Sequence, residues 1–124
     1  MKSNAPEVIE FNIPMFCEKI LICVSPNMDI IKELFPKEDL PDTNNSMGYA
    51  FSAMHKDGNS RMLIWVRNWH LPTLLHEIYH TVFSILDYMG VNDTETGAYM
   101  LEYIYTEMVR QRSINRKSGS SQCS

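Results

Sequence analysis

The sequence has few cysteines, no long apolar run and no excess of positive charge. Its three cysteines, Cys17, Cys23 and Cys123, show no C-x-x-C spacing, so neither a disulfide framework nor a cysteine zinc site is expected. No apolar stretch reaches the length of a membrane span, and the N-terminus lacks the pattern of a signal peptide. A net charge of -4 argues against a dedicated nucleic-acid binder. We therefore expect a cytoplasmic protein with no membrane or nucleic-acid partner.

A length of 124 residues predicts one domain with a single core. A hydrophobic content of 44% and a charged content of 21% are ordinary for a globular protein. The segment Ser118-Gly119-Ser120-Ser121 has no side chain able to bury apolar surface. We expect a folded domain over residues 1–117 and a disordered tail over residues 118–124.

Three strands and two long helices are predicted from the hydrophobic pattern. Residues 1–8 are expected to form an untethered terminus, and residues 19–24 a buried strand. Asp57-Gly58 predicts a hairpin that joins two further strands at residues 47–54 and 61–67. A short helix is expected over residues 30–35, a surface loop over 36–46, and long helices from Leu71 to Gly90 and from Asn92 to about Arg112. The expected fold class is α+β, with an antiparallel or mixed sheet packed on the two long helices.

The first long helix carries the motif His76-Glu77-Ile78-Tyr79-His80, which has the pattern H-E-x-x-H. Two imidazoles four residues apart stand on one face of a helix and can both reach a single Zn²⁺. The glutamate between them can act as a general base toward a water molecule on the metal. The motif therefore predicts a zinc site.

A catalytic zinc site usually has three protein ligands, so the sequence after His80 has to supply one more. A metzincin would have glycine and histidine where this chain has Phe83 and Leu86, and that class is excluded. A carboxylate from the second long helix is the remaining common choice. The candidates are Glu95, Glu102 and Glu107, of which the first two share a helical face.

These motifs resemble the zincin metallopeptidases. Residues 73–82 are similar to the extended zincin pattern, and Glu95-Thr96-Gly97-Ala98 resembles the E-x-x-A segment that supplies the glutamate ligand in gluzincins. Residues 76–104 are similar to a group of small phage and prophage proteins that are presumed to be metallopeptidase-like. The resemblance implies a minimal zincin-like fold, a zinc ion held by His76, His80 and Glu95, and Glu77 as the general base.

Glu95 and Glu102 are both candidates for the third zinc ligand. Glu95 follows His80 more closely than the ligand usually does in gluzincins, and it matches the E-x-x-A segment. If the two long helices form a simple antiparallel hairpin, Glu102 lies level with His80 instead. Glu95 reaches the metal if the first helix ends early or the pair crosses steeply.

The sequence therefore predicts a zinc-dependent hydrolase, in the first place a metallopeptidase acting on a peptide or protein, with a host protein as one such substrate. A strand over residues 62–66 could present an edge to an extended peptide. Candidates for stabilising the oxyanion are His70, Tyr99 and Tyr103. The alternative is a non-catalytic binding protein, a phage-encoded modulator of a host factor, in which zinc only joins the two helices.

Overall fold

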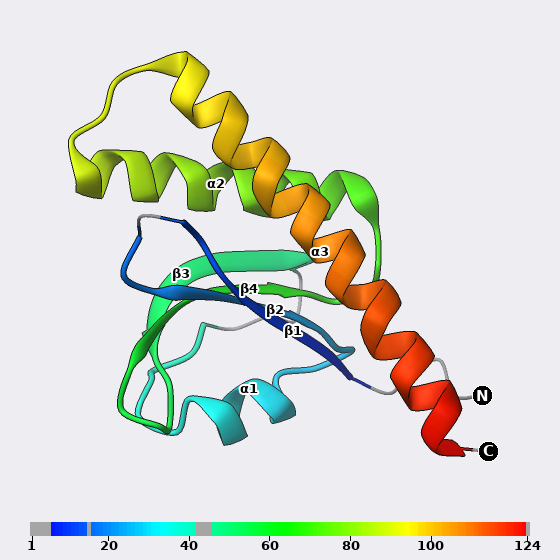
Figure 1. The fold of residues 1–124 in the computed structure, drawn as a ribbon. Helices are drawn as coiled ribbons and strands as arrows, with labels where there is room; N and C mark the ends of the chain where they lie inside the picture. The colour runs from blue at the N-terminus through cyan, green and yellow to red at the C-terminus, as the bar shows by residue number, and fades with distance from the viewer. Residues whose placement is uncertain (1–5, 15, 42–45, 124) are drawn as a thin grey trace.

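The computed structural model describes residues 6–14, 16–41 and 46–123, and it describes side chains as far as Lys117. Along the chain its elements are β1 (Glu7–Asn12), β2 (Lys19–Val24), α1 (Asp29–Leu34), β3 (Gly48–Met54), β4 (Ser60–Val66), α2 (Leu71–Met89) and α3 (Thr94–Cys123). Figure 1 shows the strands gathered in one sheet, with α2 and α3 on one face and α1 on the other. The predicted α+β class is confirmed.

The sheet has four strands in the order β1-β2-β4-β3. β1 pairs antiparallel with β2, β2 pairs parallel with β4, and β3 pairs antiparallel with β4 through the predicted hairpin. Gly58 in the hairpin turn has a φ of 93°, a conformation that favours glycine. The mixed sheet was one of the two predicted kinds, and the strand β4 is central because it has a neighbour on each side.

The prediction of three strands was wrong, because residues 7–12 form the fourth. Ile9 and Phe11 are buried, and the residues that alternate with them, Val8, Glu10 and Asn12, are exposed, which is the period of a strand. The strand begins inside the segment that was expected to be an untethered terminus. Glu7 accepts hydrogen bonds from Arg112 of α3, and Glu10 is paired with Arg61 of β4. Both partners are distant in sequence, so the sequence pattern alone could not show how this edge is tied down.

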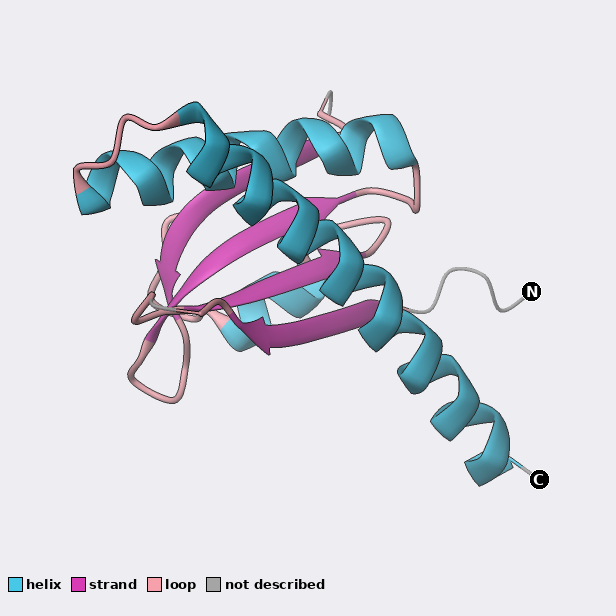
Figure 2. Ribbon diagram, turned by 45° about the horizontal axis from the view of Figure 1, so that its top comes forward, coloured by secondary structure: helices cyan, strands magenta, loops and turns pink. Residues whose placement is uncertain are grey.

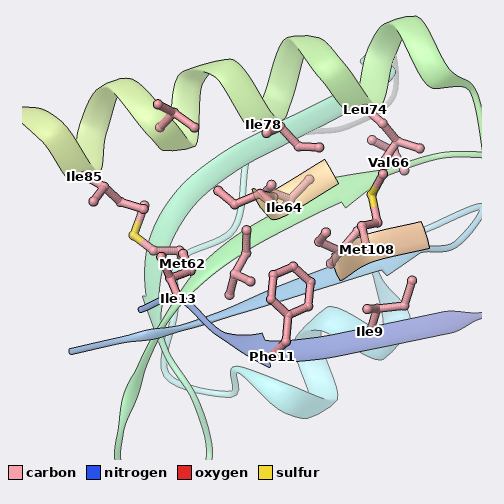
Figure 3. Close-up of a cluster of buried hydrophobic side chains, with 14 of the residues drawn as sticks. Ile9, Phe11, Ile13, Met62, Ile64, Val66, Leu74, Ile78, Ile85 and Met108 are labelled. Atoms are coloured by element: carbon pink, nitrogen blue, oxygen red, sulfur yellow. The ribbon is translucent and has the colours of Figure 1, made fainter. Parts of the chain in front are cut away.

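The sheet separates two hydrophobic clusters, and this explains why β2 is apolar from Ile20 to Val24 and β4 from Met62 to Val66. Side chains alternate between the faces of a strand, and a strand covered on both sides has no polar face. The larger cluster lies between the sheet and the helices α2 and α3. Figure 3 shows its side chains between α2 and the strands. From the strands it includes Ile22 and Ile64, and from the helices Ile78, Ile85 and Ile104.

The second cluster lies between the opposite face of the sheet and α1. Trp65 is fully buried there beside Ile31 and Phe35. Its indole N–H donates a hydrogen bond of 3.0 Å to the Ser25 hydroxyl, which itself donates to the carbonyl of Asn27. The buried indole N–H therefore has a hydrogen-bond acceptor, and this bond links the segment after β2 to β4.

Both long helices form where they were expected, but α3 continues to Cys123 instead of ending near Arg112. The expected tail at residues 118–124 stays a prediction, because its side chains and Ser124 lie outside the described residues. Residues 42–45 of the expected surface loop also lie outside them. Among the described residues, no helix is long and apolar enough to cross a membrane.

Candidate metal centre

The ends of α2 set the rotation of the helix and so decide which side chains face outward. His70 precedes the helix in an extended conformation, Pro72 lies in its first turn, and Gly90 ends it with a φ of 73°. The Nδ1 atom of His70 lies 2.9 Å from the Thr73 hydroxyl, so one ring nitrogen of this imidazole forms a hydrogen bond at the start of the helix. Leu74 and Ile78 are then buried against the sheet, and His76 and His80 are exposed on the opposite side.

The imidazoles of His76 and His80 converge. Their Nε2 atoms lie 3.1 Å apart, and the rings are nearly perpendicular with centroids 4.7 Å apart. Zinc–nitrogen bonds are about 2.0–2.1 Å long, so two nitrogens at this separation can share one ion with an angle of roughly 100° between the bonds. That angle is close to tetrahedral. The donor pair therefore fits the predicted metal.

Glu77 points to a different side of the helix. One residue turns a helix by about 100°, and this places the side chain between α2 and the sheet, with 7% of its surface exposed. Burial raises the pKa of the Glu77 carboxyl above its ordinary value, and the nearby His76 and His80 oppose this effect. No hydrogen bond or ion pair to this carboxylate occurs among the residues that the structure describes.

Gly48 makes room for Glu77. A Cβ atom at position 48 would lie 3.2 Å from Glu77 Cγ, 3.1 Å from Val66 Cγ1 and 3.0 Å from the backbone oxygen of Trp65. Gly48 is the first residue of β3, and a glycine in a strand often marks the close approach of another group. Gly48 is not among the site residues predicted from the sequence. Its position at the start of a predicted strand was the available signal.

Glu95 and Glu102 lie on α3 and are both exposed. Asp93 caps this helix, because its carboxylate accepts hydrogen bonds from the Glu95 backbone N–H and the Thr96 hydroxyl. Figures 1 and 2 show α3 crossing α2 diagonally, so the two helices do not form a simple antiparallel hairpin. Gly97 lies close to α2, because a Cβ at this position would lie 3.1 Å from Leu86 Cδ1.

The structure brings together two of the three predicted ligands. Within the described part of the chain, no group of three histidine, cysteine, aspartate or glutamate side chains is close enough to hold a metal ion. Neither Glu95 nor Glu102 therefore joins His76 and His80 in this arrangement of α3. The choice between the two glutamates stays open.

The three residues considered for the oxyanion lie on two elements: Tyr99 and Tyr103 are one turn apart on α3, and His70 precedes α2. The Tyr103 hydroxyl donates to the carbonyl of Asn12 at 3.2 Å, which holds it beside β1. Tyr99 lies on α3 with 65% of its surface exposed, and His70 contacts Thr73. Among the described residues, none of the three makes a hydrogen bond or ring contact with His76 or His80.

A pocket of about 430 Å³ lies between the C-terminal half of α2 and the start of α3. Tyr79 and Phe83 line it, and their rings stack at 6.2 Å. Tyr79 also lies beside His80, with ring centroids 6.5 Å apart. An apolar cavity therefore borders the imidazole pair.

The strand that was expected to bind a peptide at its edge is not an edge strand. β4, which contains residues 62–66, is paired with β2 on one side and with β3 on the other. Its backbone groups are used inside the sheet, so it cannot accept an added strand. β3 forms the edge next to Glu77.

Comparison with known proteins adds no relative. No family model, no curated protein and no solved structure matches this chain.

Proposed function

We propose that this protein is a zinc-dependent hydrolase that cleaves peptide bonds. The convergence of the His76 and His80 Nε2 atoms at 3.1 Å is the observation that carries the proposal. Two imidazoles in this arrangement supply half of a tetrahedral site and leave the solvent side open. Bound there, zinc would lower the pKa of a coordinated water and polarise a carbonyl group.

Glu77 is the proposed general base. A base works best when its pKa lies near the working pH, and burial raises the Glu77 pKa in that direction. Packing against Gly48 limits the positions that its side chain can take. Glu77 would accept a proton from the attacking water and return it to the leaving amine.

The edge strand β3 supports a peptide as the substrate. It starts at Gly48, against which Glu77 packs, and its outer side has no neighbouring strand among the described residues. An extended peptide can add to such an edge by backbone hydrogen bonds, and this mode of binding places a scissile amide along the strand. The base and the substrate backbone would then lie on the same side of α2.

Zinc content and hydrolysis test the proposal together. Wild-type protein should contain one zinc per chain by mass spectrometry and should cleave a fluorescence-quenched peptide library, and removal of the metal by a chelator should abolish cleavage. His76→Ala should lose the zinc. Glu77→Gln should keep the zinc and lose most of the turnover, because general-base catalysis contributes about 10²–10⁴-fold. Glu33→Gln, at an exposed position of α1, is the matched control and should behave as wild type.

The third ligand is tested by the same measurement. Glu95→Gln and Glu102→Gln each remove one carboxylate from the exposed face of α3. The variant that lowers zinc affinity identifies the ligand, with Glu95 preferred because of the E-x-x-A segment. Wild-type protein without zinc under zinc-replete conditions would refute the proposal.

The second candidate is a binding protein in which zinc only joins α2 to α3. One observation favours it: the Glu77 side chain is buried toward β3, whereas the two imidazoles are exposed to solvent. In this case Glu77→Gln keeps its zinc, and neither wild type nor variant cleaves any peptide of the library. Loss of zinc should then lower the unfolding temperature.

A further inference from the structure

A groove at the start of α2 combines apolar and cationic side chains, and it includes neither Glu77 nor the two histidines. It lies between the start of α2 and the C-terminal half of α3, has a volume of about 810 Å³, and is open to solvent. Figure 2 shows this half of α3 projecting beyond the sheet. We call it the basic groove; its apolar wall is formed by Trp69, Leu71, Tyr105 and Val109, and its cations are Arg112, Arg116 and Lys117.

The side chains of the apolar wall are partly exposed to solvent. Leu71, Tyr105 and Val109 expose 40%, 36% and 42% of their surface. Neighbouring apolar side chains at this exposure are typical of a surface that binds another molecule. Leu71 and Tyr105 come from different helices, so the wall depends on how α3 crosses α2.

One cation of the groove is held in place. The Arg112 guanidinium lies 3.9 Å from the Trp69 ring and donates hydrogen bonds of 2.8 and 3.1 Å to the Glu7 carboxylate. Its charge is balanced by Glu7, and its role is to form the floor of the groove. Arg116 and Lys117 are exposed, and no acidic partner for either occurs among the described residues.

The helix dipole does not explain these cations. Basic residues are favourable in the last turn of a helix, but α3 continues to Cys123 and has none there. Among the described residues that line the groove none is acidic, although the whole chain has a net charge of -4. Two unbalanced cations beside an apolar wall are complementary to a ligand that is both acidic and apolar.

We propose that the basic groove binds an acidic segment of a partner protein, with its apolar side chains on Leu71, Tyr105 and Val109 and its carboxylates at Arg116 and Lys117. A protein segment fits better than a nucleic acid, because phosphate binding uses many cations and has no need of an exposed aliphatic wall. It also fits better than an anionic membrane, because binding to anionic lipids typically uses a cluster of about four to eight cations, and the groove has only Arg112, Arg116 and Lys117.

Binding is measured by fluorescence anisotropy with the full chain and a short labelled peptide in which aspartate and glutamate alternate with leucine and phenylalanine. A peptide with asparagine and glutamine in place of the acids is the charge control. The acidic peptide should bind saturably, and its affinity should fall as salt is raised, since the cations are exposed. Equal binding of the two peptides, or no saturable binding of the acidic one, would overturn the proposal.

Charge reversal locates the binding site. Arg116→Glu should weaken binding about fivefold to tenfold, because one favourable surface pair is replaced by a repulsive one. Arg110→Glu is the matched control: it makes the same charge change on α3, but Arg110 pairs with Glu107 outside the groove, and the effect should stay below about twofold. Val109→Ser should weaken binding without changing the salt dependence.

Three further results count against the proposal. Equal losses in Arg116→Glu and Arg110→Glu would mean that only net charge matters. Tighter binding to a single-stranded oligonucleotide or to vesicles with anionic lipid than to the peptide would assign the groove to that ligand class. Because the proposal uses neither His76 nor Glu77, it can fail while the hydrolase proposal stands, and the reverse also holds.

Discussion

Substitution of Gly48 by alanine tests the contact that positions Glu77. The added Cβ would lie 3.0 Å from the Trp65 backbone oxygen, 3.1 Å from Val66 Cγ1 and 3.2 Å from Glu77 Cγ. Overpacking of this kind costs about 1–3 kcal/mol, whereas replacing a glycine inside a strand gains about 0.5–1 kcal/mol. The backbone oxygen belongs to the central strand β4 and cannot move alone. We expect Gly48→Ala to lower the free energy of unfolding by about 1–2 kcal/mol.

Gly97→Ala is the matched control. Its added Cβ meets Leu86 Cδ1 at 3.1 Å, which is the end of a flexible side chain, and alanine is favoured over glycine in a helix by about 0.8–1.0 kcal/mol. Urea unfolding followed by circular dichroism should show Gly48→Ala destabilised and Gly97→Ala unchanged or slightly stabilised. Gly48→Ala should also lose more peptidase turnover than zinc content, because Glu77 is the group displaced. Equal stability of Gly48→Ala and wild type would refute the close approach.

Two further predictions concern charged groups. Burial raises the folded-state pKa of Glu77 above its ordinary 4.5, so wild-type stability should fall as pH rises above that value. Glu77→Gln removes this dependence and should be more stable than wild type at pH 7, and the difference in stability should vanish near pH 4. Urea unfolding at several pH values measures this difference. A difference that stays constant with pH would contradict the prediction. Arg61 is 5% exposed and donates hydrogen bonds to the partly exposed carboxylates of Glu10 and Asp57. Arg61→Ala should therefore cost about 1.5–3 kcal/mol, the range for hydrogen bonds to charged groups. The Arg61 hydrogen bond lowers the pKa of Asp57 to about 2, so the loss should shrink as pH falls from 3.8 toward that value. A loss unaffected by acid would mean that Arg61 acts through packing alone.

The strands β2 and β4 could be predicted because their burial is local in origin. Each is a continuous apolar run, and Asp57-Gly58 marks the turn before β4. The strand β1 could not be predicted with the same means. Glu7 and Glu10 make it look like a solvated terminus, and the arginines that balance them are reached only after the chain has folded.

The helix α2 was predicted in full because its signals are sequential. Pro72 and Gly90 mark its ends, and the apolar residues between them recur with helical spacing. The extension of α3 past Arg112 has no such signal, because residues 113–117 are mostly polar and are exposed. Its first half is anchored by Ile104 and Met108 in the core.

By itself, the sequence determined the spacing of His76 and His80, because four residues on a helix bring two side chains to one face. It also determined that Glu77 would lie on another side of that helix. Only the tertiary structure decided what Glu77 packs against, since Gly48 reaches it through the pairing of β3 with β4. The crossing of α3 over α2, which sets the positions of Glu95 and Glu102, is likewise a feature of the tertiary structure, and it places Gly97 beside Leu86. Helical periodicity is a property of neighbouring residues, whereas these contacts join segments that only packing brings together.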